Sequence, residues 1–113
     1  MFKSTHNKGF QITLPNGYSI SCQFGSTNYC SRRTSLFSQG VFSLPLSEEM
    51  KNPINESPDC EVTIWRGDSR IYVTDKIMEA VGINPSEYGT ASFQAYVTAY
   101  EFATIVAYLK DLD

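Results

Sequence analysis

The feature that most constrains this chain is an alternation of apolar and polar residues on both sides of an Asn-Gly pair. Apolar side chains occupy every second position within residues 9–14 and again within residues 18–24. Between these runs lie Asn16 and Gly17, two residue types that tolerate the positive φ angles of tight hairpin turns. Because alternation with a period of two is typical of strands with one buried face, the two segments are predicted to form a β-hairpin.

Strand and helix signals return in the second half of the chain. Residues 60–65 and 70–74 are rich in β-branched and aromatic residues, and the Gly-Asp pair between them predicts a second hairpin. Thr74 is the expected N-cap of a short helix that ends at Gly82. Residues 92–97 predict one further strand.

The C-terminal segment is predicted to be an amphipathic helix. Thr98 and Glu101 have the spacing of a capping box, in which each side chain bonds to the backbone of the other residue. An apolar stripe with helical spacing follows, formed by Phe102, Ile105, Val106 and Leu109. Since the stripe needs an apolar surface to bury against, the helix should cover one face of the sheet.

The remaining segments are expected to be connections. Residues 1–8 read as a loose lead-in, and residues 25–40 are rich in the Ser, Thr, Asn and Gly residues that favour turns. Residues 41–46 could form a short edge strand limited by Pro45, and residues 47–59 an exposed connection. The predicted fold class is α+β: an antiparallel sheet of about five strands, made of two hairpins and one strand, with a short helix and a C-terminal helix packed on one face.

Length and charge narrow the class of protein. The 113 residues suffice for a single domain, taken as residues 1–113, with its own hydrophobic core. A net charge of −3 argues against general nucleic-acid binding, which needs a basic surface. The chain has no apolar run long enough to span a bilayer, and its polar N-terminus does not resemble a signal peptide, so a cytoplasmic protein is expected.

The residue types and their spacing do not indicate a catalytic site. The only histidine, His6, lies near the N-terminus, away from any evident partner for acid–base catalysis. Cys22, Cys30 and Cys60 lack CxxC spacing and are expected to be free thiols, with Cys22 and Cys60 buried as small apolar residues; a Cys22–Cys30 disulfide would need an oxidising compartment. We therefore expect a non-enzymatic protein with no catalytic residue, cofactor or metal site.

Aromatic side chains on one face of the sheet indicate an interaction surface. The alternation sends one set of apolar side chains to the core, namely Val62, Ile64, Ile71 and Val73. It sends three aromatic residues to the opposite face, namely Trp65, Tyr72 and Tyr96. Exposed rings form an apolar patch that favours a partner. Three interpretations remain open: residues 25–59 fold over the rings, the rings form the interface of a homodimer or higher oligomer, or they form a ligand platform.

A second candidate site is the polar loop that follows the first hairpin. It combines amides, aromatic rings and guanidinium groups in one short stretch: Gln23, Phe24, Asn28, Tyr29, Arg32 and Arg33. Groups of these kinds can stack on a base and bind a phosphate or carboxylate. The structural alternative is that the arginines pair with Glu61 or Asp68 and that Tyr29 belongs to the core.

Residues 7–33 carry a pattern that resembles the opening of a group of small bacteriophage proteins, most of them uncharacterised. The matching residues are Asn7, Lys8, Gly9, Phe10, Asn16, Gly17, Tyr18, Gln23, Phe24, Gly25, Asn28, Tyr29, Cys30 and Arg33. Residues 61–65 and 96–109 also resemble later parts of that group. The resemblance implies a phage origin, and small phage proteins of this size often counter host immunity by binding. It implies no catalytic residue.

Two functional hypotheses follow. The first is an anti-defence inhibitor that binds a host defence protein or complex through the aromatic sheet face or an acidic surface. The second is a sponge that sequesters a cyclic nucleotide or cyclic ADP-ribose signal, with residues 23–33 supplying the aromatic platform and the arginines. The inhibitor is placed first because the net charge of −3 weighs against a phosphate ligand. A structural or housekeeping phage protein is a third, less specific interpretation.

Overall fold

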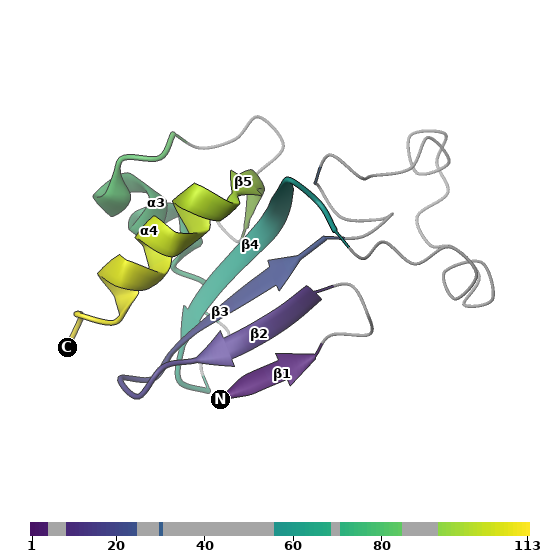
Figure 1. Ribbon diagram of the computed structural model, residues 1–113. Coiled ribbons are helices and arrows are strands. Elements are labelled where there is room, and N and C mark those ends of the chain that lie inside the picture. The colour runs from purple at the N-terminus through teal and green to yellow at the C-terminus, as the bar shows by residue number, and fades with distance from the viewer. Residues whose placement is uncertain (5–8, 25–29, 31–55, 69–70, 85–92) are drawn as a thin grey trace.

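The computed structural model describes residues 1–4, 9–24, 30, 56–68, 71–84 and 93–113. Its elements follow one another along the chain as β1 (Phe2–Ser4), β2 (Gly9–Thr13), β3 (Tyr18–Gln23), β4 (Asp59–Arg66), α3 (Thr74–Val81), β5 (Gln94–Thr98) and α4 (Ala99–Leu109). Figure 1 shows the strands side by side in one sheet, with both helices on one side of it.

The order of the strands in space is their order in the sequence. The five strands pair as β1-β2-β3-β4-β5, and every pair is antiparallel. The first predicted hairpin is confirmed, because β2 and β3 are paired along their whole common length. Its turn is closed by the Gly17 amide, which donates to the Leu14 carbonyl over 2.9 Å, and Gly17 has a φ of 91°. The predicted α+β class, with a five-stranded antiparallel sheet and a C-terminal helix, is therefore confirmed.

One face of the sheet carries the hydrophobic core. The side chains that alternate inward from β3 and β4 are buried, and Ile20, Val62 and Ile64 have no exposed surface. Helix residues pack against them in the same cluster, namely Ile77, Met78, Ile105 and Leu109. Each side chain of this size stabilises the fold by about 1.5–3 kcal/mol when fully buried. The alternation read from the sequence therefore identifies the central part of the core correctly.

Helix α4 begins and packs as the sequence predicts. The Thr98 hydroxyl accepts a hydrogen bond from the Glu101 amide, and the Glu101 carboxylate accepts one from the Thr98 amide, so the capping box is present. Ile105 is fully buried beneath the helix. Phe102, at the margin of the core, meets Phe10 of β2 edge to face, with 5.8 Å between ring centroids. The helix thus reaches across the sheet as far as β2.

The first turn is joined to the end of α4 through Asn16. The Asn16 side-chain amide donates to the carbonyl oxygens of Leu109 and Leu112, over 2.7 Å and 2.8 Å. Carbonyls in the last turn of a helix have no partner within the helix and need one from elsewhere. The Asn16 side-chain oxygen also accepts from the Tyr18 amide. A residue predicted only to shape a turn therefore also holds the hairpin against the helix.

The expectation of a loose lead-in over residues 1–8 is wrong for its first part. Residues 2–4 form β1, an edge strand paired with β2. The pairing includes the first residue: the Met1 ammonium donates to the Thr13 carbonyl and the Thr13 amide donates to the Met1 carbonyl, each over 2.9 Å. Three residues are too few to show alternation, and their hydrogen bonds depend on the hairpin beside them.

The strand predicted over residues 70–74 is also wrong. Among its described residues only Tyr72 bridges to β4, opposite Trp65, and helix α3 already begins at Thr74. Ile71, expected in the core, is 74% exposed. The physical reason lies at the edge of β4, where β5 pairs with the first half of the strand. Only a short stretch of edge is left beyond it before the chain turns into α3.

Helix α3 and its left-handed C-cap at Gly82 are confirmed, but Thr74 is not the N-cap. The N-cap residue is Val73, and no side chain caps the helix. The Thr74 hydroxyl is buried and accepts a hydrogen bond from the Ile64 amide of β4 over 3.0 Å. A buried strand amide without a partner costs about 1–3 kcal/mol, so the hydroxyl contributes more to stability there than as a cap.

Two further expectations concern the rest of the chain. Among the described residues, neither helix is long and apolar enough to cross a membrane. The edge strand predicted over residues 41–46 lies outside the described residues.

Candidate functional site

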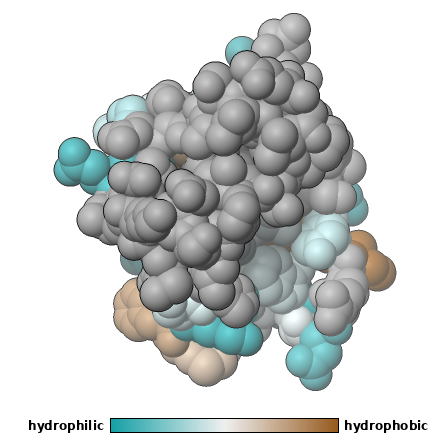
Figure 2. Space-filling model, turned by 90° about the vertical axis from the view of Figure 1, so that its right-hand side faces the viewer, coloured by the Kyte–Doolittle hydropathy of each residue, from teal (hydrophilic) through white to brown (hydrophobic). Residues whose placement is uncertain are grey.

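The sheet face turned away from the helices is polar, and we call it the polar face. The strand register places the following side chains on it: Lys3, Gln11, Thr13, Ser19, Ser21, Gln23, Glu61, Thr63 and Trp65. Trp65 is the only one of these residues that is not polar or charged. Figure 2 views the molecule from the right-hand side of Figure 1, where hydrophilic and hydrophobic residues stand next to each other on the described surface. Because Trp65 is the only apolar side chain among those named, the polar face differs from the apolar patch that the exposed aromatic rings predicted.

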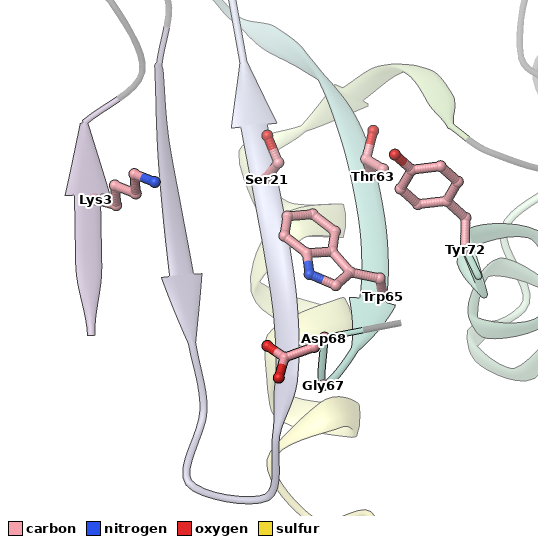
Figure 3. Close-up of a pocket in the computed structure, with 7 residues that line it drawn as sticks. All are labelled: Lys3, Ser21, Thr63, Trp65, Gly67, Asp68 and Tyr72. Atoms are coloured by element: carbon pink, nitrogen blue, oxygen red, sulfur yellow. The ribbon is translucent and has the colours of Figure 1, made fainter. Parts of the chain in front are cut away.

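A pocket of about 610 Å³ opens on the polar face, as Figure 3 shows. Its described lining comes from β1, β3, β4, the turn that follows β4 and the residue bridged to β4: Lys3, Ser21, Thr63, Trp65, Gly67, Asp68 and Tyr72. Pockets that bind small molecules have volumes of about 300–1,000 Å³. The pocket is thus large enough for one small organic molecule.

Two aromatic rings form the apolar part of this pocket. Trp65 and Tyr72 are bridged through their backbones, and their ring centroids lie 6.3 Å apart with the ring planes at 89°. In Figure 3 the indole extends from β4 over β3, while the Tyr72 ring points toward Thr63 from the other side of β4. Trp65 stands opposite Ser19 in the strand register, and Ser19 is buried. The backbone pairing thereby places the two rings next to each other, and their planes are almost perpendicular.

Charged groups lie at two ends of the pocket. The Gly67 amide donates to the Gly17 carbonyl over 2.9 Å, and Gly67 has a φ of 65°, so the chain turns sharply after β4. This turn brings Asp68 to the rim, where Figure 3 shows its carboxylate on the side of the indole nitrogen. Lys3 approaches from the opposite edge, on β1, and extends over β2.

Most polar groups of the lining are available to a ligand. Within the described residues, no hydrogen bond or ion pair involves the side chains of Lys3, Thr63, Trp65, Asp68 or Tyr72. The Ser21 hydroxyl accepts a hydrogen bond from the Gln23 side-chain amide over 2.9 Å, which leaves its own proton free to donate. The pocket therefore offers an ammonium, an indole N–H and three hydroxyls as donors, and one carboxylate as a strong acceptor.

The structure separates the residues that the sequence grouped as an interface. Trp65 and Tyr72 lie together in the pocket, as their alternation predicts. Tyr96 does not line it and occupies β5, the strand predicted over residues 92–97, where the pairing with β4 shifts register. Its φ of 54° is unusual for a residue other than glycine. Trp65 and Tyr72 therefore share the pocket without Tyr96, and an interface formed by the three residues stays a prediction.

The loop predicted as a ligand site is described only at its start. Gln23 bonds to Ser21 at the margin of the pocket, and Phe24 packs against the hydrophobic core. Four of its proposed binding residues lie outside the described residues: Asn28, Tyr29, Arg32 and Arg33. The sequence reading missed five lining residues, namely Lys3, Ser21, Thr63, Gly67 and Asp68. For Ser21 and Thr63 a signal existed, because alternation places them on the same face as Trp65.

The cysteines belong to the core side of the sheet. Cys22, Cys30 and Cys60 are buried and form no disulfide, which confirms the expectation for Cys22 and Cys60. The hydrogen bond between the Cys22 and Cys60 thiols, together with burial, raises the pKa of the Cys60 thiol above its ordinary value. A thiol with a raised pKa is a poor nucleophile at neutral pH. Among the described residues, no group of three or more His, Cys, Asp or Glu side chains is placed to hold a metal ion.

Comparisons with known proteins leave the pocket as the main guide to function. No protein-family model matches the chain, and neither the curated proteins nor the solved structures contain a significant match.

Proposed function

We propose that this chain is a binding protein without catalytic chemistry of its own, which holds a small molecule in the pocket of the polar face. The observation that carries the proposal is the pair Trp65 and Tyr72, two rings at a right angle in a concave and otherwise polar surface. Tyr72 is 41% exposed. Apolar ring surface left in contact with water favours a ligand that covers it, by about 25 cal/mol for each Å² removed from water.

The shape of the site supports a small molecule over a protein partner. A stable protein interface buries about 800 Å² on each partner around an apolar centre. The polar face has one aromatic pair surrounded by hydroxyl, amide and charged groups. A concave site with a few convergent polar groups is the usual form of a small-molecule site.

The resemblance of residues 7–33 to small bacteriophage proteins supports an anti-defence setting for this binding, in the cytoplasm of the host cell. In that setting the protein would act by sequestration. Sequestration needs no reaction, because binding alone lowers the free concentration of the captured molecule. The proposal shares only sequestration with the sponge hypothesis: its site is the pocket in place of residues 23–33, and it does not require a nucleotide as the captured molecule.

A second candidate function, the inhibitor of a host protein, is favoured by one observation on the helix side. Tyr100 of α4 is 83% exposed and Tyr108, two turns further along, is also exposed. Tyrosine is enriched in protein interfaces. For this function, Tyr100→Ala and Tyr108→Ala should break the capture of a host protein, whereas Trp65→Ala should leave it intact.

The small-molecule proposal can be tested with the protein's own fluorescence. Trp65 is the only tryptophan of the chain, so its emission reports on the pocket without labelling. We expect at least one member of a mixed panel of sugars, nucleosides, nucleotides and amino acids to give a saturable change in emission and to protect Trp65 from acrylamide quenching. The variant Tyr100→Ala is the matched control and should respond as the parent does. If no member changes the emission, or if Tyr72→Ala leaves the response unaltered, the pocket is not the binding site.

A further inference from the structure

The pocket lining itself narrows the chemistry of the ligand, an inference that rests on the proposed function. Its described charged residues are one ammonium, on Lys3, and one carboxylate, on Asp68. Their charges cancel, and they come from opposite sides of the pocket (Figure 3). Sites for phosphate gather several cationic or backbone N–H donors around one anion. A balanced pair of charges favours a ligand without net charge.

The aromatic pair favours a ligand with one flat apolar face. The indole of Trp65 lies over β3, with Tyr72 upright beside it at 89°. A pyranose ring has this two-sided character, because its axial C–H bonds form an apolar face while its hydroxyls project from the rim. Stacking that face on the indole would cover apolar surface and leave the sugar hydroxyls beside the polar groups of the lining.

The free polar groups match sugar hydroxyls better than the edge of a nucleobase. The hydroxyls of Ser21, Thr63 and Tyr72 can each rotate to donate or accept, as sugar hydroxyls do. The Asp68 carboxylate can accept from two neighbouring hydroxyls at once, and the Lys3 ammonium can donate to others. A nucleobase edge presents a fixed pattern of donors and acceptors and gains less from rotating partners. The lining therefore accommodates a ligand that is neutral and carries several hydroxyl groups.

The surroundings extend the same chemistry beyond the pocket. Gln11, Thr13 and Glu61 lie on the polar face of neighbouring strands, outside the pocket lining. The Thr13 and Ser19 hydroxyls are 2.9 Å apart and bond to each other. Hydroxyl and amide groups thus continue across β3 and β2, on the side of Trp65 that faces away from Tyr72.

We propose that the ligand is a neutral carbohydrate, with one sugar ring stacked on Trp65, its hydroxyls bound by Asp68, Lys3 and the pocket hydroxyls, and further rings lying along the polar face. Asp68 is the main acceptor and Trp65 the platform. Tyr72 closes the site from the side.

The experiment is calorimetric titration of the full chain with four neutral tetrasaccharides: cellotetraose, maltotetraose, mannotetraose and tetra-N-acetylchitotetraose. Adenosine, AMP, cyclic di-AMP and cyclic ADP-ribose form the comparison arm. We expect saturable binding of at least one tetrasaccharide at millimolar or lower concentration. Trp65→Ala and Asp68→Asn should each weaken it by about tenfold or more, since each removes an interaction of roughly 1.4 kcal/mol or greater.

Matched variants separate lost contacts from lost folding. Trp65→Phe keeps an aromatic ring and should retain more affinity than Trp65→Ala, while Glu79→Gln removes an exposed carboxylate from α3 and should bind as the parent does. Urea unfolding of every variant shows whether the fold is intact. Binding of adenosine or a nucleotide in the pocket, with no tetrasaccharide bound, would overturn the carbohydrate assignment and leave the proposed function standing. If no compound of either arm binds, and no member of the mixed panel changes the emission of Trp65, both the carbohydrate assignment and the proposed function are overturned.

Discussion

The absence of a side chain at Gly9 allows β2 and β3 to pair. Its φ is 141°, and a Cβ atom there would overlap the backbone carbonyl oxygen of Cys22 on the facing strand. A side chain would therefore meet both a strained backbone and a rigid neighbour. Only glycine at this position allows β2 and β3 to approach each other as closely as they do.

We expect Gly9→Ala to lower the free energy of unfolding by about 3 kcal/mol or more, because the facing backbone must move. Urea unfolding measures the loss as a lower midpoint with an unchanged slope. Gly82→Ala is the matched control: Gly82 also has a positive φ, of 78°, but its added Cβ would meet no atom within 4 Å. The Gly82→Ala substitution should lower the free energy of unfolding by about 1–2 kcal/mol. Equal losses in the two variants would show that the clash with Cys22 contributes nothing.

The Cys60 thiol should make stability fall in mildly alkaline solution. Its pKa is raised by the hydrogen bond with Cys22 and by burial, whereas the unfolded thiol ionises near about pH 8.5. Above that pH the unfolded chain releases a proton that the folded chain keeps, so the free energy of unfolding decreases as pH rises. The stabilising effect is fully present below the unfolded pKa and is lost above it.

Unfolding curves between about pH 7.5 and 9.5, recorded with a reducing agent, test this dependence. Cys60→Ala should have a shallower alkaline decrease than the parent, and a lower stability at neutral pH because a buried group is lost. Val62→Ala, on the same strand and also buried, should lose stability without a change in the pH dependence. A decrease as steep in Cys60→Ala as in the parent would exclude Cys60 as its source.

At the scale of elements, prediction succeeded where the signal lies inside the element. The first hairpin has its turn residues and its alternation in one stretch, and α4 has its capping box and apolar stripe in another. Strand β1 carries no such signal, since its place is set by hydrogen bonds to β2. The segment after Asp68 has strand-like composition, but β5 occupies part of the edge that a strand would need.

In the candidate site, too, the residues that could be predicted are those whose signal lies inside their own element. Alternation along β4 predicts that Trp65 turns away from the core, and composition marks it as an aromatic site. Lys3 carries no local signal because β1 itself has none, and Asp68 reaches the pocket only through the turn at Gly67. The arginines that the sequence offered as ligand groups, Arg32 and Arg33, lie outside the described residues and stay a prediction.

The contact between the first turn and α4 predicts an unusual effect of one small substitution. Asn16→Asp keeps the size of the side chain but replaces an amide that donates to Leu109 and Leu112 with a carboxylate facing their carbonyl oxygens. We expect a loss of about 2–3 kcal/mol at neutral pH, from two lost hydrogen bonds and the repulsion between oxygens.

The pH dependence of this variant identifies the cause. The surrounding carbonyls raise the pKa of the introduced carboxyl, so its neutral form is favoured in the folded state. The deficit relative to the parent should therefore shrink as pH falls toward about 4, where the carboxyl binds a proton that it can donate. Asn16→Ser, which has no charge, should show a deficit that does not change with pH. The two variants are compared by urea unfolding at both pH values.

At the scale of the whole molecule, we predict self-association through the outer edge of β1. No described strand pairs with that edge, and Phe2 on it is 84% exposed. Because Met1 and Thr13 exchange hydrogen bonds, the backbone groups of Phe2 point outward, where a second chain can bind them. The homodimer expected from the sequence stays a prediction, and a dimer formed through this edge would leave the pocket open.

Light scattering at micromolar concentration should give the mass of a dimer for the parent and of a monomer for Phe2→Lys, in which a charge blocks edge pairing. Trp65→Ala should remain dimeric. The opposite result, a monomer only for Trp65→Ala, would place the contact on the polar face and close the pocket. A monomeric parent would remove self-association altogether.

Because neighbours in the sheet are neighbours in the chain, each strand can pair with one that the ribosome has already released, and the longest delay falls between β3 and β4. Strand β3 ends at Gln23 and β4 begins at Asp59, so 35 residues must be made between them. At about 5–20 residues per second this takes about 2–7 s. During that time the strands already made have an unpaired edge at β3, and the side chain of Ile20 has no helix to cover it. The newly made protein is therefore most exposed to wrong pairing in the interval before β4 emerges.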